Sequence, residues 1–300
     1  MDENQIIKTI KTITNSEFIG DDCAYINDLD IVITQDSLVE DVHFKRKWIS
    51  PFQLGYKSVV VNISDILASG AEPYSISVSL SLPQDLDNNF ITEFYKGAKK
   101  ALNGVKITGG DITGSSDKIF ISIAAIGKTK NRNISSRKNA KNGYIIITKG
   151  NFGSSAKGLK DLINGNNDSA FIKTHLEPKL EYDFSNYIST NISVPYAMMD
   201  TSDGLADALF KIAEASHVSI NVEYDCIPHL EGVLEDEILF GGEDYKLVAA
   251  VPEDFALKIP NCVKIGTITD FNGYYLKISD KEYKNYNELN TYNHFGENNG

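Results

Sequence analysis

The sequence predicts a mixed α/β fold with two domains. Short apolar or alternating segments, typical of strands, are interleaved with longer segments that have the periodicity of helices. A polar and basic stretch at residues 128–143 contains almost no apolar side chains and divides the chain into two such halves. The length of 300 residues is sufficient for two domains of ordinary size. We therefore expect one α/β domain over residues 1–137 and a second over residues 138–300.

The first half contains a strictly alternating segment, SISVSLSL, at residues 75–82. Its period of two predicts a half-buried strand with one apolar face and one face made only of serine. The serine face is consistent with a subunit interface and equally with solvent. The other elements expected in this half are a strand at 31–34, a helix at 52–69 closed by Gly70, a helix at 89–102, a turn at 108–111 and a strand at 119–126.

The second half opens with an apolar strand at residues 144–148. The glycine- and serine-rich loop at 150–158 leads into a helix. Two of its glycines have P-loop spacing, but the Lys and the Ser or Thr that complete a P-loop are missing. The polar tail after residue 281 contains aromatic side chains, which predict partial docking. A further helix is predicted by apolar residues repeating at the spacing of one helix face, namely Leu205, Ala208, Leu209, Ile212 and Ala213.

The composition is ordinary for a globular protein, but the charge excludes some partners. A net charge of −12 argues against binding to nucleic acids and to anionic membranes. The start, MDENQIIKTI, lacks the pattern of a signal peptide, and apolar runs are only strand-length, so we expect a soluble cytoplasmic protein. The three cysteines, Cys23, Cys226 and Cys262, occur singly, which argues against disulfides and zinc and favours buried or inert thiols.

Five short segments place aspartates among glycine, serine, threonine or asparagine instead of among lysines. Each segment alone is more typical of a turn or a helix N-cap than of a metal site. Together they favour a metal site, because acids gathered at strand ends and loop–helix junctions repel one another unless cations hold them together. Magnesium prefers such oxygen ligands, with substrate phosphates and waters. The segments are residues 20–22, 34–36, 62–65, 109–111 and 200–204.

The predicted helix at 52–69 carries a polar stripe opposite an apolar one. The stripe consists of Ser58, Asn62, Asp65 and Ser69. Solvent faces usually carry lysine and glutamate, whereas this stripe is short and mostly uncharged. We therefore favour a stripe that faces a site, with a plain solvent face as the alternative.

Eight motifs follow one another over nearly the whole chain. They are GDDCAYI at 20–26, ITQDSLVEDVHF at 33–44, LGYKSVVVNISDILASGAEP at 54–73, ITGGDITGS at 107–115, MDTSDGLADAL at 199–209, LFGGEDYKLV at 239–248, IGTIT at 265–269 and YNHF at 292–295. In this order they resemble the thiamine-monophosphate kinase family. The set is highly specific, although no single motif is.

The resemblance implies a two-domain α/β fold shared with aminoimidazole ribonucleotide synthetase and selenophosphate synthetase, and a homodimer. It also implies direct in-line transfer of the γ-phosphoryl group of ATP to thiamine monophosphate, assisted by several Mg²⁺ ions, as the final step of thiamine diphosphate synthesis. A covalent enzyme intermediate is unnecessary, because an ionised phosphate oxygen of the acceptor is already the nucleophile.

The resemblance further implies roles for single residues. Contacts to thiamine monophosphate are expected at His43, Glu243 and Tyr292, which outside this context would be interpreted as a structural histidine, a turn acid and a surface aromatic. Within the metal set, Asp36, Asp65 and Asp111 are expected to carry the catalytic Mg²⁺ cluster. ATP contacts are expected at Tyr95, Gly110, Asp111, Arg137 and Ser202. Metal ligands are expected at Asp22, Thr34, Gln35, Asp36, Asp65, Asp111, Asp200 and Asp203.

Three positions depart from the family pattern without touching the central aspartates. They are Gln35, Tyr144 after Gly143, and the segment HLEPKL at 175–180, where relatives carry arginines. Two alternatives stay open: an ATP-using enzyme of the same superfamily with a different acceptor, and a nucleotide-binding regulator without catalysis. The intact aspartates argue against the regulator. Selenophosphate synthesis is disfavoured because Cys23 lies inside GDDCAYI and not in a glycine-rich loop.

Overall fold

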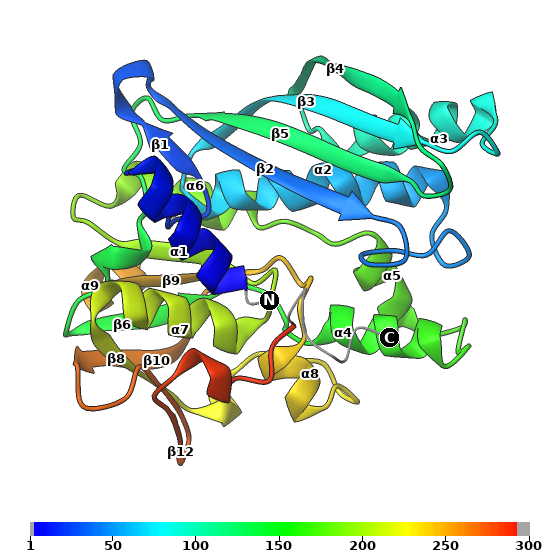
Figure 1. Ribbon diagram of the computed structural model, residues 1–300. Coiled ribbons are helices and arrows are strands. Elements are labelled where there is room, and N and C mark those ends of the chain that lie inside the picture. Colours follow the sequence, from blue (N-terminus) through cyan, green and yellow to red (C-terminus); the bar gives the residue numbers. More distant parts are fainter. Residues whose placement is uncertain (1–2, 293–300) are drawn as a thin grey trace.

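The computed structural model describes residues 3–292 (Figure 1). Within this range the strands form one sheet of five strands and one of seven. The first sheet is built from residues 24–128 and the second from residues 144–283. The mixed α/β fold expected from the sequence is thereby confirmed. The domain boundary at residues 137/138 lies in the segment between the two sheets and stays a prediction.

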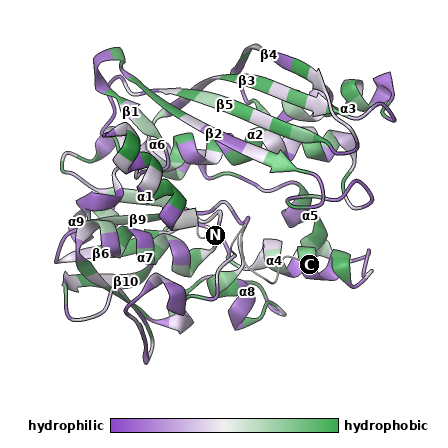
Figure 2. Ribbon diagram, in the orientation of Figure 1, coloured by the Kyte–Doolittle hydropathy of each residue, from purple (hydrophilic) through white to green (hydrophobic). Residues whose placement is uncertain are grey.

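The five-stranded sheet has the order β1-β2-β5-β3-β4. The pair β3 and β4 is parallel, and the other neighbouring pairs are antiparallel. Hydrophobic and weakly polar residues alternate along β3 (Figure 2), so this strand has one apolar and one polar face. Its strands are β1 (Ala24–Ile26), β2 (Ile31–Val39), β3 (Glu72–Leu82), β4 (Lys106–Gly114) and β5 (Phe120–Lys128).

The apolar face of this sheet packs on α2 (Pro51–Ala68), which in turn packs on α3 (Asn88–Ala101). The start of α2 is fixed by a capping box between Ser50 and Gln53, with proline at the first helical position. The two helices approach very closely, since a Cβ added at Gly55 would lie 1.9 Å from the carbonyl oxygen of Phe94. Among the described residues, no helix covers the opposite, polar face of the sheet.

The seven-stranded sheet has the order β12-β11-β8-β10-β6-β9-β7. Successive residues of β6 enter different cores: Ile145 and Ile147 pack in the core that contains α2, and Ile146 packs in the core beneath α7 (Leu205–Ser216). The layers are therefore sheet, helices, sheet and helix (Figure 1). The strands are β6 (Tyr144–Thr148), β7 (Ala197–Asp200), β8 (Val218–Val222), β9 (Leu247–Pro252), β10 (Val263–Asp270), β11 (Leu276–Ile278) and β12 (Lys281–Tyr283).

The remaining helices lie mostly around the second sheet, while the amphipathic α1 stays largely exposed. In the described part of the chain, none of the helices has the length and apolar character that crossing a membrane requires. The remaining elements are α1 (Glu3–Thr14), α4 (Ser154–Ile163), α5 (Ala170–Leu176), α6 (Tyr182–Asn191), α8 (Glu235–Phe240), α9 (Glu253–Ala256) and the 3₁₀ turns η1 (Asn27–Leu29), η2 (Arg137–Asn139), η3 (Tyr224–Cys226) and η4 (Tyr286–Glu288).

Most predicted elements are confirmed to within a few residues, but one is wrong and one is too short. The expected turn at 108–111 lies inside β4, because the glycines there pair in register with β3. The strand expected at 31–34 continues to Val39, since its polar residues pair with β5 as regularly as its apolar ones. All three cysteines are free. Cys23 is buried as expected, whereas Cys226 is exposed.

Candidate metal and substrate site

Three aspartates from distant parts of the chain meet between the two sheets. Asp22 lies in the loop before β1, Asp65 lies in the last turns of α2, and Asp200 ends β7. One carboxylate oxygen of each lies within 4.8 Å of those of the other two. Oxygens that share one divalent ion lie about 3–5 Å apart, because each sits about 2–2.5 Å from the ion. The spacing of the three carboxylates therefore suits a shared cation.

Two residues of β2 extend this acid cluster. The hydroxyl of Thr34 donates a hydrogen bond of 2.6 Å to Oδ2 of Asp65. The backbone N–H of Asp36 donates a bond of 3.0 Å to Oδ1 of Asn62. Asn62 is 2% exposed and Ser58 is 1% exposed, so the polar stripe of α2 does not face solvent. Its middle, at Asn62 and Asp65, faces β2 and the acids, as the sequence favoured.

Burial and mutual repulsion disfavour the charged forms of these acids. Burial, together with the charges of Asp203 and Asp22, raises the pKa of Asp36 to about 6. Burial and the charge of Asp22 raise the pKa of Asp200 to about 7. The pKa of Asp65 is also well above its usual range, through burial and then the charges of Asp36 and Asp200. A bound cation would relieve both effects.

The residues present fit Mg²⁺. The donors are carboxylate and hydroxyl oxygens, which this ion prefers. Oδ1 of Asp200 is buried and has no hydrogen-bond partner among the described residues, an unusual state that a cation would satisfy. Asp22, Asp65 and Asp200 would hold the ion, with Thr34 and Asp36 beside them.

The loop that carries Asp22 is anchored to η2. The hydroxyl of Ser136 and the backbone N–H of Arg137 each donate a 2.7 Å hydrogen bond to Asp21. The guanidinium of Arg137 donates a 2.7 Å bond to Asp22. Arg137 therefore lies directly behind the acid cluster. Its Nε has no hydrogen-bond partner among the described residues.

Asp203 lies at the edge of the cluster, where its charge adds to the repulsion on Asp36 and Asp200. It does not cap α7: the residue at the cap position is Gly204, and no side-chain capping bond forms there. Instead, Oδ2 of Asp203 accepts a bond of 3.3 Å from the ammonium group of Lys211.

Two of the three expected acceptor residues, His43 and Glu243, come together at a second point. Glu243 has a positive φ of 65°, and its backbone N–H donates a 2.7 Å bond to the carbonyl of Ser202, which ties it to the segment that carries Asp203. Although burial acts to raise the pKa of Glu243, Lys57 and then, to a smaller extent, His175 and His43 lower it. His43 and Glu243 are therefore brought within electrostatic range of each other. Tyr292 is 44% exposed at the end of the described chain, and the rest of the YNHF motif lies outside the described residues.

Gln35 and Asp111 do not join the cluster within one chain. Asp36 lies on the helix-covered face of the first sheet, whereas Gln35, one residue earlier, points to the open face and donates a 3.0 Å bond to Ser122. Asp111 pairs with Ser79 and is exposed on the same open face. Three strand spacings separate it from β2, which amounts to about 14 Å. Of the expected metal set, these two residues are thus placed apart from the others.

The remaining expected ATP residues are also dispersed. Gly110 is exposed on β4, next to Asp111. Tyr95 is half-buried on α3, with its ring edge-to-face against Phe94 at 5.4 Å. Ser202 and Arg137 lie on the side of the acid cluster. The structure therefore gathers the metal and acceptor residues more completely than the ATP residues.

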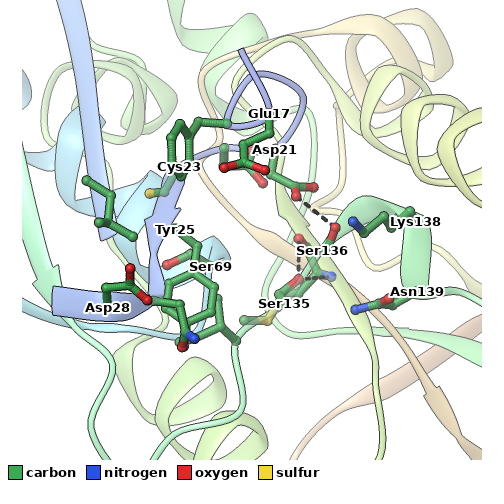
Figure 3. A pocket seen from close by; sticks show the side chains of 16 residues that line it. Glu17, Asp21, Cys23, Tyr25, Asp28, Ser69, Ser135, Ser136, Lys138 and Asn139 are labelled. Carbon is green, nitrogen blue, oxygen red and sulfur yellow. Dashed lines mark hydrogen bonds between the residues drawn. The ribbon is translucent and has the colours of Figure 1, made fainter. Parts of the chain in front are cut away.

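A cavity of about 500 Å³ opens beside the cluster (Figure 3). Asp21, Asp22 and Cys23 line one side, and residues 134–136 with Lys138 and Asn139 line the other. Asp22 belongs both to the cavity wall and to the acid cluster, so the two are continuous. Burial, followed by the charges of Asp65 and Asp22, raises the pKa of the Cys23 thiol. This supports the expectation of an inert thiol.

Three residues at the site were missed from the sequence. Ser64 bonds to Asp200, and Lys57 and His175 contact Glu243. Lys57 gave a usable signal, since it is the only basic residue in the predicted helix at 52–69. A single lysine amid apolar residues of a buried helix requires an acidic partner. Ser64 and His175 gave no comparable signal.

Known proteins resemble this chain in sequence over most of its length. Residues 20–129 match the family described as AIR synthase related protein, N-terminal domain. The thiamine-monophosphate kinase of Bacillus subtilis (strain 168) is 33% identical over 98% of this chain and 100% of its own length. The thiamine-monophosphate kinase of Aquifex aeolicus (strain VF5) is 31% identical over 94% of this chain and 97% of its own.

Solved structures show the same relationship. The structure of AaThiL complexed with AMPPCP and TMP has a TM-score of 0.89 and 30% identity, covering 98% of this chain and 97% of its own. The HypE–HypF complex, at 21% identity and a TM-score of 0.73, shares the fold. The fold and the enzyme class expected from the motifs are thereby confirmed. The chain is a kinase and belongs to the thiamine-monophosphate kinase family.

Proposed function

We propose that this kinase transfers the γ-phosphoryl group of ATP to thiamine monophosphate in the cytoplasm, giving thiamine diphosphate and ADP, with Mg²⁺ ions. The observation that supports the proposal is the convergence of Asp22, Asp65 and Asp200, together with the bond that ties Glu243 to Ser202, the neighbour of Asp203. Relatives named thiamine-monophosphate kinase, and a structure that holds AMPPCP and TMP, support the choice of substrates.

The chemistry requires two anionic phosphates to meet in line. When bound, Mg²⁺ supplies the positive charge that screens their repulsion and stabilises the transition state. An oxygen of the acceptor phosphate forms a bond to the γ-phosphorus, and the bond from that phosphorus to the β–γ bridging oxygen breaks. The enzyme provides no covalent nucleophile. Thr34 and Asn62 hold Asp65 and the backbone of Asp36, so that the carboxylates keep their directions.

We propose the ligands that the family motifs imply, and the positions of the residues at the acid cluster support them. Asp22, Thr34, Asp36, Asp65, Asp200 and Asp203 serve the metal ions from within one chain. Arg137 and Ser202 contact ATP, and His43, Glu243 and Tyr292 contact thiamine monophosphate. The hydrogen bond from Glu243 to Ser202 joins the loop that carries Glu243 to the segment that carries Asp203.

We further propose a homodimer formed through the open face of the five-stranded sheet. This face presents small side chains, Ser77, Ser79 and Ser81, next to the exposed strand β4. If Asp111 and Gln35 serve a metal site, a second copy must supply them, because both point away from the acid cluster of their own chain. The small residues would permit close approach of two such faces.

The experiment that tests the proposed reaction follows the γ-phosphorus of labelled ATP. Purified protein is incubated with this ATP, thiamine monophosphate and MgCl₂, and the products are separated. We expect the label in the terminal phosphate of thiamine diphosphate. Label released only as inorganic phosphate, or transferred only to a different acceptor offered in the same mixture, would refute the proposed acceptor.

A further inference from the structure

We infer that Lys57 and His175 form a buried positioning pair that holds Glu243 in place for the acceptor, an inference that rests on the proposed function. The three residues come from separate elements: Lys57 from α2, His175 from α5, and Glu243 from the loop between α8 and β9. No motif consideration assigned a role to Lys57 or His175. Their arrangement alone carries the inference.

The central contact is the ion pair between Lys57 and Glu243. Nζ of Lys57 lies 2.9 Å from Oε1 of Glu243, and the lysine side chain is only 1% exposed. A lysine buried to this degree requires a counter-ion, because an unpaired ammonium group inside a protein is very costly. Glu243 is the one acid within ion-pair distance of it in the described part of the chain. Lys57 therefore holds one carboxylate oxygen of Glu243 by charge attraction, without a well-aligned hydrogen bond between its Nζ and any described residue.

His175 approaches the other carboxylate oxygen. Its Nδ1 lies 3.5 Å from Oε2 of Glu243 and 3.1 Å from the hydroxyl of Ser155 in α4. Burial, followed by the positive charge of Lys57, lowers the pKa of His175 to about 4, so the ring is neutral at physiological pH. The pair thus supplies one positive charge, which matches the single negative charge of Glu243.

The backbone around Glu243 needs this support. Glu243 and Tyr245 both have positive φ, at 65° and 51°, a conformation that residues with side chains seldom adopt. Gly242 lies so close to the neighbouring loop that a Cβ there would be 2.4 Å from the carbonyl oxygen of Ser202. Asp244, which follows Glu243, is held separately, because its carboxylate accepts hydrogen bonds from the backbone N–H groups of Gly153 and Ser155. A side chain on such a strained loop keeps one direction only if other groups hold it.

Function follows from the position of the pair behind Glu243. The carboxylate is about a quarter exposed, whereas Lys57 and His175 are buried, so only Glu243 can reach a substrate. Lys57 and His175 are positioning residues that act through it. Because the pair lies on the acceptor side, its loss should weaken binding of thiamine monophosphate and leave ATP binding unchanged.

The test compares K57M, E243Q and the double variant K57M/E243Q with wild type. In K57M we expect the KM for thiamine monophosphate to rise about 10–100-fold, with the KM for ATP within about twofold. E243Q should give a similar rise, and the double variant should be no worse than either single one, because both changes remove one contact. Lys264→Met, which breaks an exposed ion pair with Glu253, is the matched control and should change nothing.

A second variant keeps the test decisive if K57M does not fold. His175→Gln exchanges one neutral side chain for another and should raise the KM for thiamine monophosphate about 3–10-fold, without changing ATP binding. The positioning role would be overturned by equal rises in KM for both substrates. It would also be overturned if the rise in KM of the double variant equalled the product of the rises in K57M and E243Q. A wild-type protein that does not use thiamine monophosphate would overturn the proposed function instead, so the two failures are distinguishable.

Discussion

The hydroxyl of Ser64 donates a 2.5 Å hydrogen bond to Oδ2 of Asp200, with both residues fully buried. Ser64 belongs to α2, which packs on the first sheet, and Asp200 ends a strand of the second. The bond therefore joins the two halves of the chain at the acid cluster itself. It leaves Oδ1 of Asp200, which has no partner among the described residues, as the atom that can meet a cation.

Replacing Ser64 by alanine removes this bond and leaves a buried carboxylate oxygen unsatisfied. We expect S64A to lower the free energy of unfolding by about 1–3 kcal/mol, measured by urea denaturation with a chelator present. Ser193→Ala, in an exposed loop, is the control and should change stability by less than about 0.5 kcal/mol. Equal stability of S64A and wild type would show that the bond does not hold Asp200.

The acid cluster could be predicted from the sequence because its segments share a local signature. Aspartates beside small residues pointed to Asp22, Asp36, Asp65 and Asp200, and the mostly uncharged stripe of α2 pointed to its side of the site. Local sequence patterns do not show which face of the sheet a strand side chain will occupy, because that depends on how the strands pair. Gln35 and Asp36 are neighbours in sequence, yet pairing with β5 sends them to opposite faces.

The partners of Glu243 could not be predicted for a different reason. Lys57 and His175 are 186 and 68 residues away from it in the sequence, and only the packing of α2 and α5 beside one loop brings them together. The turn expected at 108–111 failed because glycines normally interrupt strands. Here Gly109 and Gly110 pair in register with Ser77 and Val78, and β4 continues through them.

Asp36 should matter for rate and not for folding. We expect D36N to lower kcat at least about 100-fold, because it removes a ligand of the Mg²⁺ that would stabilise the charge on the reacting phosphates. Its melting temperature should equal or exceed that of wild type without metal, since a repelled buried charge is removed. The exposed Asp254→Asn is the control. Near-normal turnover by D36N would contradict its place in the Mg²⁺ cluster.

The metal-free protein should lose stability as the pH rises. The pKa of Asp200 is raised to about 7 in the folded state, above its unfolded value near 3.8, so the stabilising effect of its protonated form is present below the unfolded pKa and is lost as pH rises through about 7. Between pH 5 and 8, wild type in a chelator should lose about 2–4 kcal/mol relative to D200N. The measurement is urea denaturation of both proteins across this range. Parallel pH profiles of the two would contradict the shift.

Added Mg²⁺ should reverse that loss in wild type. A cation that binds only the folded state stabilises it by mass action. At pH 8 we therefore expect MgCl₂ to raise the melting temperature of wild type and to have little effect on D200N or D65N. The comparison with Asp254→Asn separates site binding from general salt effects. A uniform rise in all variants would show that the ion does not bind at the cluster.

The dimer proposal predicts complementation between inactive variants. If Asp36 comes from one copy and Asp111 from the other, D36N and D111N are each inactive, but a mixed dimer contains one intact site. Mixing equal amounts after reversible dissociation should restore about a quarter of wild-type activity. Absence of any restoration, with mixed dimers demonstrated by mass spectrometry, would place Asp111 outside a shared site.

One measurement addresses the proposed reaction as a whole. Purified protein is mixed with thiamine monophosphate, ATP and MgCl₂, and both thiamine diphosphate and ADP are quantified with and without a chelator. We predict that the two products appear in equal amounts and that the chelator abolishes both. ADP without thiamine diphosphate, or thiamine diphosphate formed undiminished in the presence of the chelator, would contradict a Mg²⁺-dependent phosphoryl transfer to thiamine monophosphate.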